Sequence, residues 1–111
     1  MKCISWQDFE SVDIRVWTII DVQDFPEIRN PSYKVWVDFW PELWIKKTSA
    51  QITQLYSKDE LTWKQILWVV NFEPKQIGKF MSEFLITGIH TDSGVVLSSL
   101  ERGVDNGSKL V

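Results

Sequence analysis

A chain of 111 residues with 44% hydrophobic and 24% charged residues has the size and composition of one globular domain, which we expect to span residues 1–111. The 12 Lys and Arg against 15 Asp and Glu give a net charge of -3, the opposite of the basic balance of a general nucleic-acid binder. With Cys3 as the one cysteine and His90 as the one histidine, the sequence argues against a disulfide, a zinc site and a histidine-dependent active site. We therefore expect a protein that is not an enzyme and carries no cofactor.

Membrane insertion is not expected, because the apolar runs are short. A membrane helix needs about 20 consecutive apolar residues, and no such run occurs. Near the N-terminus, Asp8 and Glu10 arrive before the apolar core of a signal peptide could develop. The expected location is the cytoplasm.

The first expected elements are a short helix and a strand. Residues 5–8 have the form of a capping box, Ser followed three residues later by Asp, so a helical turn should carry Trp6 and Phe9 on one side. Residues 13–22 then alternate and predict a half-buried strand, with Trp17 on the outward face. The positions expected to face the core are Ile14, Val16, Ile20 and Val22.

A loop, a hairpin and two short helices are expected next. Two prolines break residues 24–31, which should form a loop. Residues 33–39 alternate as a strand, and 44–48 form the return strand after Pro41. Residues 49–55 suggest a short helix, and a second capping box marks 57–60. In the strand over 33–39, the core positions are Tyr33, Val35, Val37 and Phe39.

Residues 64–89 form the centre of the pattern. The apolar run at 66–70 predicts a buried strand, and Pro74 forces the chain to turn after it. The loop over 71–83 contains basic and aromatic side chains. A strand over 84–89 then folds back through a turn onto residues 95–97, and Asn106-Gly107 marks a further turn. This periodicity predicts a small β-rich barrel.

Five motifs in order make the chain resemble the tRNA-binding domain family, in particular its small stand-alone CsaA-like members. The motifs are Asp13-Ile14-Arg15-Val16, Phe25-Pro26-Glu27, Ser49-Ala50-Gln51-Ile52-Thr53, Val69-Val70-Asn71-Phe72 with Met81-Ser82-Glu83, and Asn106-Gly107. The resemblance implies an all-β oligonucleotide-binding (OB) fold, a Greek-key barrel with short helices. It also implies a homodimer formed near the chain ends, for which the candidate interface residues are Ile4, Trp6, Phe9 and Val104.

By the same resemblance, the function is non-catalytic binding of structured tRNA. The alternative is an export-related molecular chaperone that binds unfolded peptides or preproteins. The candidate RNA-binding residues are Lys34, Ser49, Gln51, Asn71, Phe72, Lys75, Met81, Ser82 and Glu83. Asn71, Ser82 and Glu83 either contact RNA or hold the loop, and Phe72 is either a core residue or a stacking platform. Arg15 either contacts RNA or pairs with Asp13.

The 7 tryptophans are several times the ordinary number for this length. Trp17, Trp40, Trp44 and Trp63 stand where family members commonly have glycine, and Trp68 stands where a small residue is usual. A bulky residue in such a place has a steric cost at a positive φ or a close backbone approach. Three explanations are open: an extended stacking or peptide-binding surface, deliberate substitution, or glycine codons decoded as tryptophan.

Overall fold

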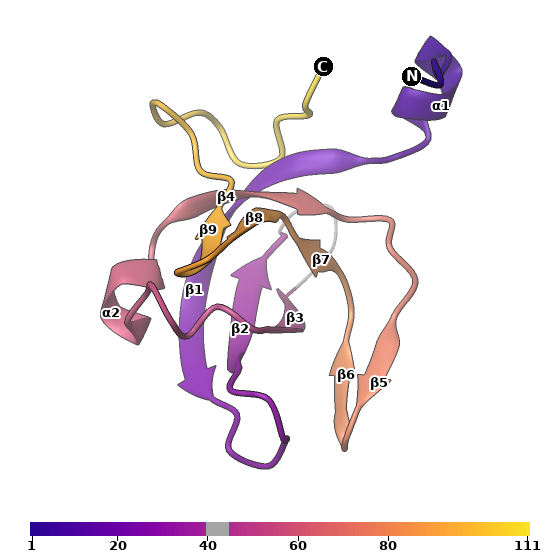
Figure 1. Cartoon of the computed structure of the whole chain (residues 1–111). Coiled ribbons are helices and arrows are strands. Elements are labelled where there is room, and N and C mark those ends of the chain that lie inside the picture. The colour runs from indigo at the N-terminus through magenta and orange to yellow at the C-terminus, as the bar shows by residue number, and fades with distance from the viewer. Residues whose placement is uncertain (40–44) are drawn as a thin grey trace.

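The structure, a computed structural model, describes residues 1–39 and 45–111. Its main body is a five-stranded sheet of order β3-β2-β1-β4-β7 that curls into a nearly closed barrel (Figure 1). The predicted all-β, OB-like fold with short helices is confirmed. In chain order the elements are α1 (Trp6–Glu10), β1 (Ile14–Asp24), β2 (Tyr33–Asp38), β3 (Ile45–Ala50), α2 (Lys58–Leu61), β4 (Gln65–Val69), β5 (Lys75–Ile77), β6 (Phe80–Ser82), β7 (Leu85–Ile86), β8 (Gly88–Thr91) and β9 (Gly94–Leu97).

The long strand β1 organises the barrel because it pairs with two different strands. Its first half pairs with β4, from Ile14 opposite Val69. Its second half pairs with β2, from Ile19 opposite Val37, and this pairing contains a bulge between Ile19 and Asp21. The bulge increases the local twist and bends the strand, which lets one strand belong to both sides of the barrel. On the far side of β3, the backbone N–H of Glu83 donates to the carbonyl of Lys47 at 2.9 Å and nearly closes the ring.

The bulge also explains an error in the prediction for β1. Trp17 was expected to face outward, but it is 2% exposed and belongs to the core together with Ile19 and Val22. Val16 is buried as well, outside that core cluster, where the C-terminal segment covers it: its N–H donates to the carbonyl of Ser108 at 3.0 Å. In β2 the predicted alternation is confirmed, and Tyr33, Val35, Val37 and Phe39 are buried.

Trp68, which stands where a small residue is usual in the family, lies fully buried in the core. Its indole N–H donates to the carbonyl of Trp17 at 3.1 Å, and its ring lies 4.8 Å from that of Phe84. The indole nitrogen of Trp17 is buried without a hydrogen-bond partner among the described residues. Trp40 and Trp44 lie outside the described residues.

Trp63 carries the backbone strain that the sequence pattern indicated. Its φ is +72°, in the left-handed region that favours glycine, and it is the one non-glycine residue at positive φ in the described ranges. Its side chain is 73% exposed at the turn from α2 into β4. The cost of this conformation is therefore not offset by burial of the ring.

Three other expectations are corrected. The helix predicted over 49–55 does not form: β3 continues to Ala50, opposite Tyr33, and a turn follows. The apolar pattern there reflects Ile52, which is buried in the hydrophobic core although it does not lie on a helix. The segment over 71–83, expected as a loop, contains the β5–β6 hairpin, and the strand expected over 84–89 is divided into β7 and β8.

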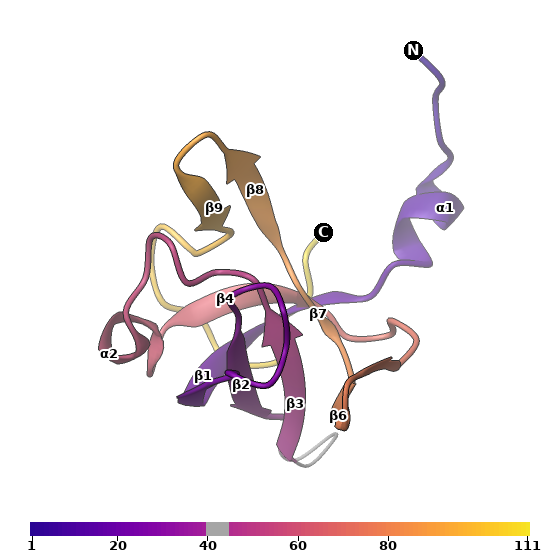
Figure 2. The same ribbon diagram turned by 60° about the horizontal axis from the view of Figure 1, so that its bottom comes forward.

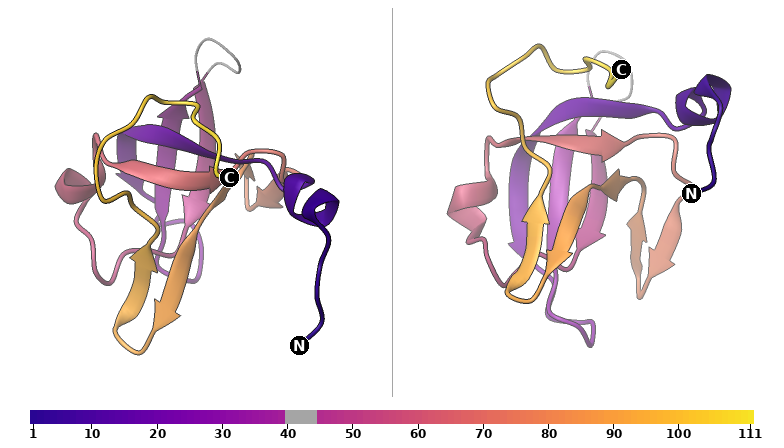
Figure 3. Two further views of the ribbon diagram at one scale, coloured as in Figure 1. Left: turned by 90° about the horizontal axis from the view of Figure 1, so that it is seen from above. Right: turned by 45° about the horizontal axis from the view of Figure 1, so that its top comes forward.

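Both capping boxes are confirmed, at Ser5 with Asp8 and at Ser57 with Glu60. Hydrogen bonds from the backbone and the side chain of Ser57 hold the pKa of Glu60 below its ordinary value. The helix α1 buries none of its residues, and the views in Figures 2 and 3 show it standing away from the barrel, within an N-terminal arm that continues beyond it to the N-terminus. Among the described residues, no helix has the length and apolar character needed to cross a membrane.

Candidate nucleic-acid interface

The β5–β6 hairpin stands beside the barrel and is fixed at its base to β3. Its tip turns at Gly78, whose φ of +62° suits glycine. At its base, the Ser82 hydroxyl oxygen lies 2.7 Å from that of Thr48 and accepts the N–H of Ser49 at 3.2 Å. Next to it, Glu83 accepts the N–H of Lys47 at 3.2 Å. These contacts orient the hairpin against the open face of the barrel.

Five of the candidate RNA-binding residues line one pocket between the hairpin and β3, which we call the Lys75 pocket. It measures about 220 Å³. Phosphate needs cations and an unpaired base needs a flat apolar surface, and the pocket offers Lys75 for the first and Phe72 for the second. The candidate residues in its lining are Ser49, Gln51, Phe72, Lys75 and Ser82.

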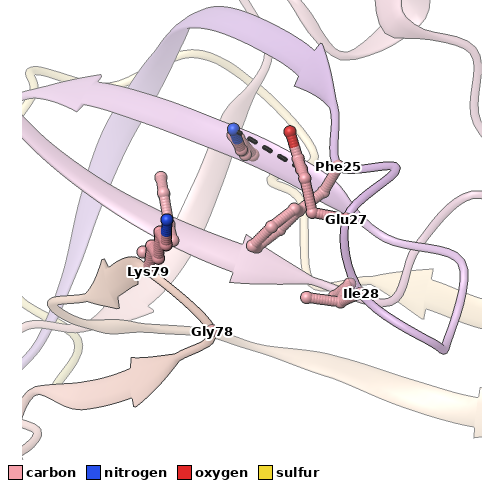
Figure 4. Close-up of a pocket in the computed structure, with 7 residues that line it drawn as sticks. Phe25, Glu27, Ile28, Gly78 and Lys79 are labelled. Atoms are coloured by element: carbon pink, nitrogen blue, oxygen red, sulfur yellow. Dashed lines mark ion pairs between the residues drawn. The ribbon is translucent and has the colours of Figure 1, made fainter.

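Lys34 lies in a neighbouring pocket, the Lys34 pocket, which measures about 470 Å³ (Figure 4). Its Nζ lies 3.8 Å from the carboxylate of Glu27 and 4.8 Å from the ring centre of Phe25. Ile28 lines both pockets, so they adjoin. The lining residues of the Lys34 pocket are Phe25, Glu27, Ile28, Lys34, Gly78, Lys79 and Phe80.

The other three candidates, Asn71, Met81 and Glu83, line neither pocket. Asn71 accepts the N–H of Asp13 at 3.0 Å and donates to the carbonyl of Ser11 at 2.8 Å, so it fastens the N-terminal arm to the barrel. Met81 is exposed on β6. Glu83 pairs with Lys46 at 3.4 Å in addition to its backbone contact.

Phe72 is exposed, although its type favoured the core. It is 53% accessible and projects from the turn after β4. Of the two interpretations the sequence left open, the structure therefore favours the platform. Of the two alternatives for Arg15, the structure shows the pair with Asp13, at 2.9 Å, and Arg15 also donates to the carbonyl of Gly107.

The surface around the two pockets is rich in lysine, although the protein as a whole has a net charge of -3. The lysines are Lys34, Lys46, Lys47, Lys75 and Lys79. Within residues 1–39 and 45–111, Lys75 and Lys79 form no ion pair, whereas Lys34 and Lys46 each face one carboxylate. The Lys47 ammonium lies 5.3 Å from the ring centre of Phe80. Of these five lysines, Lys75 and Lys79 are therefore the two without an ion pair or an aromatic ring beside the ammonium group among the described residues.

Sequence reasoning missed Phe25, Ile28 and Gly78 as residues of the Lys34 pocket, whereas Lys79 and Phe80 belong to the basic and aromatic side chains it singled out in the 71–83 loop. The motif Phe25-Pro26-Glu27 marks one side of the pocket, but no pattern in the sequence indicates that the loop over 25–32 meets the tip of the hairpin. That proximity depends on how the strands curl. Among the described residues, no cluster of three or more His, Cys, Asp and Glu is arranged to hold a metal.

No family model matches the sequence. Among curated proteins, the methionine–tRNA ligase of Thermococcus onnurineus is 29% identical over 110 residues, which are 99% of this chain and 15% of that protein. That of Nanoarchaeum equitans is 31% identical over 107 residues, or 96% of this chain and 13% of that protein. The chain thus spans about 15% of the length of the first curated relatives it matches.

Solved structures match over the whole chain. The CsaA chaperone protein from Picrophilus torridus has a TM-score of 0.91 and 45% identity, covering 98% of this chain and 100% of that one. Chaperone CsaA from Bacillus anthracis has a TM-score of 0.89 and 36% identity, covering 99% and 100%. A MetRS-related protein from Pyrococcus horikoshii, at 21% identity and a TM-score of 0.85, shares the fold. With this identity over nearly all of both chains, the chain belongs to the CsaA-like tRNA-binding domain family.

Proposed function

We propose that residues 1–111 form one domain that binds structured tRNA without catalysing a reaction, across β2, β3 and the β5–β6 hairpin. The observation that carries this proposal is the convergence of Ser49, Gln51, Phe72, Lys75 and Ser82 on one pocket. The pocket supplies the Lys75 cation, the exposed Phe72 ring and the Gln51 amide, which are groups that can bind a phosphate, stack on a base and hydrogen-bond to it. The match to part of the methionine–tRNA ligases supports tRNA as the partner.

The candidate residues divide into two roles in this proposal. Lys34, Gln51, Phe72, Lys75 and Met81 contact the RNA, because their side chains reach a pocket or the open surface. The positioning residues hold the backbone from which those side chains project, and they are Ser49, Asn71, Ser82 and Glu83.

The test is a titration of the protein with bulk tRNA over a series of salt concentrations, with double-stranded DNA as the comparator. Phosphate contacts release counterions, so affinity for tRNA should fall steeply as salt rises. Because the protein is proposed to recognise the shape of tRNA, its affinity for tRNA should exceed its affinity for DNA at every salt concentration. If the folded protein shows no affinity for tRNA even at low salt, the proposal is wrong.

The second candidate function is an export-related chaperone that binds unfolded peptides or preproteins. Its support is the likeness to two CsaA chaperone proteins and the exposure of Phe72 and Met81 beside the pockets. Trp17, which the sequence suggested as part of an exposed aromatic surface, is buried and contributes nothing. This function requires suppression of the aggregation of an unfolded client at near-stoichiometric ratios, and no suppression by excess protein would contradict it.

A homodimer is proposed on the basis of the N-terminal arm. The rings of Trp6 and Phe9 lie 5.4 Å apart on a helix with no buried residue, and Ile4 and Trp6 are 67% and 61% exposed. Val104, near the other end of the chain, is exposed too. A second copy would cover this apolar surface. Sedimentation equilibrium should give twice the chain mass, and Trp6→Ala should weaken the association; a monomer at high concentration would exclude the dimer.

A further inference from the structure

The Lys34 pocket is larger than the Lys75 pocket, and of its residues the proposed function uses only Lys34. The loop after β1 contributes Phe25, Glu27 and Ile28, and the hairpin tip contributes Gly78 and Lys79. Figure 4 shows Glu27 and Ile28 on the loop side and Gly78 and Lys79 on the hairpin side. At about 470 Å³, the pocket has the volume of a small-ligand site, for which about 300 to 1,000 Å³ is usual.

Its walls combine aromatic rings with ammonium groups. The Lys34 ammonium lies 4.8 Å from the ring centre of Phe25 and 5.7 Å from that of Phe80. The Phe80 ring is half-buried, and it also lies 5.3 Å from the Lys47 ammonium. These distances are within the range of cation–π attraction, which fixes the positions of both cations. Lys79 adds a third cation at the rim, without an ion pair among the described residues.

Glu27 is the one acidic residue in the lining. Its carboxylate lies 3.8 Å from the Lys34 ammonium, and its side chain is 63% exposed. An exposed ion pair of this length contributes little stability, so an incoming anion can replace the carboxylate at small cost. Without a ligand, Glu27 reduces the positive potential at Lys34.

The two adjoining pockets repeat the same pair of groups. The Lys75 pocket offers Phe72 and Lys75, and the Lys34 pocket offers Phe80 and Lys79, with Ile28 common to both. A polymer that presents one flat ring and one anion per unit matches this repetition, and single-stranded nucleic acid is such a polymer. An acidic peptide supplies anions but not a ring at every unit.

We propose that the Lys34 pocket is a nucleotide subsite that holds one unpaired base of the bound RNA against Ile28 and Phe80, with its phosphate on Lys34 and Lys79. In this arrangement Glu27 is a specificity residue. Its carboxylate pairs with the Lys34 ammonium until a phosphate of the ligand displaces the carboxylate, so ligands without an anion are disfavoured. This inference rests on the proposed function and adds a second base site to it.

The base contact is tested with two ligands, a hexamer of adenylate and a tetrahydrofuran-phosphate hexamer that has the same phosphates but no bases. Phe80→Leu keeps an apolar side chain but removes the ring. It should weaken binding of the adenylate hexamer at least about fivefold and leave binding of the base-free hexamer unchanged. Equal changes for both ligands, or no change for either, would overturn the base contact. If Phe80→Leu does not fold, Ile28→Ala gives the same comparison from the opposite wall.

The role of Glu27 is tested by a double-mutant cycle with Lys34, using the adenylate hexamer. Glu27→Gln should raise the affinity about threefold, in line with removal of one weak ion pair, and Lys34→Gln should lower it. In the Lys34→Gln background, Glu27→Gln should change the affinity no more than Glu101→Gln, a matched change of charge far from the pocket. If Glu27→Gln raised the affinity as much in the Lys34→Gln background as in the wild type, Glu27 would act only through the net charge of the protein, and the proposal would be overturned.

Failure of this inference and failure of the proposed function give different results. If wild-type protein binds neither tRNA nor the hexamer, the proposed function itself is wrong. If wild-type protein binds tRNA and the Phe80 and Glu27 variants bind both ligands unchanged, only the subsite is wrong. Tighter binding of an acidic aromatic peptide than of the hexamer, with the same dependence on Phe80, would assign the pocket to peptides instead.

Discussion

The hydroxyl oxygens of Thr48 and Ser82 lie 2.7 Å apart, and they join β3 to the end of β6. Thr48 is 1% exposed and donates to the carbonyl of Phe84 at 2.7 Å, so Ser82 donates to Thr48 and accepts the N–H of Ser49. The chain of bonds runs from the core to the base of the hairpin. It places a structural anchor directly beneath the residues proposed to contact RNA.

Replacing Ser82 by Ala should therefore reduce stability more than an ordinary surface substitution. The change leaves the N–H of Ser49 without its partner and removes the bond to Thr48, at a cost of about 1 to 3 kcal/mol in the free energy of unfolding. Urea denaturation measures this cost. Ser93→Ala, in the exposed turn between β8 and β9, is the control and should stay within about 0.5 kcal/mol of the wild type. Equal effects of the two changes would contradict the anchor.

Lys75→Ala should weaken binding of tRNA of any sequence, because Lys75 is proposed to contact phosphate and not bases. The slope of the logarithm of the affinity against the logarithm of salt concentration should fall by about one. Lys109→Ala removes the same charge from the C-terminal segment beside β1 and should leave that slope unchanged. The same loss of slope for both variants would mean that tRNA responds to overall charge and not to the pocket.

The variant Phe72→Ala distinguishes between two roles of Phe72, a platform on which a base stacks and a residue that packs against the protein. Since the ring is 53% exposed, its loss should change the free energy of unfolding by less than about 1 kcal/mol. Binding of tRNA should weaken by about 1 to 3 kcal/mol, the usual effect of removing a stacked aromatic side chain. Parallel calorimetry of unfolding and of tRNA binding measures both quantities. A large loss of stability with unchanged affinity would make Phe72 a packing residue.

Trp63→Gly should stabilise the protein. A residue with a side chain at a φ of +72° costs about 1 to 2 kcal/mol relative to its ordinary conformation, and glycine avoids that cost. Trp63→Ala is the matched control, because it removes the same exposed ring but keeps a Cβ. The glycine variant should exceed the alanine variant by about 1 kcal/mol in the free energy of unfolding. If alanine is as stable as glycine, backbone strain at this position is not the cause.

Local signals in the sequence were sufficient to predict where both helices begin and which residues of β2 are buried. The capping boxes at Ser5 and Ser57 involve residues three apart, and both helices begin where those residues stand. The alternation in β2 also held, because β2 has β1 on one side and β3 on the other without a bulge in its pairing with β3. In each case the deciding interactions lie close together in the chain.

Elements decided by distant contacts could not be predicted in this way. A bulge in β1 moved Trp17 into the core, and nothing in the alternation of residues 13–22 marks where a bulge will fall. Ser49 was expected to begin a helix, but its N–H pairs with Ser82, which is far away in sequence. The Lys34 pocket depends on a loop and a hairpin tip that only the closed barrel brings together.

The measurement that tests the central claim most directly is the mapping of amide chemical shifts as tRNA is added to isotope-labelled protein. The proposed interface predicts that the largest changes occur at Gln51, Phe72 and Lys75, continue to Lys34 on β2 and to Lys79 at the tip of the β5–β6 hairpin, and leave the β8–β9 hairpin unaffected. Changes concentrated on the β8–β9 hairpin or on α1, with Gln51, Phe72 and Lys75 unperturbed, would contradict it and place the tRNA on another face of the barrel.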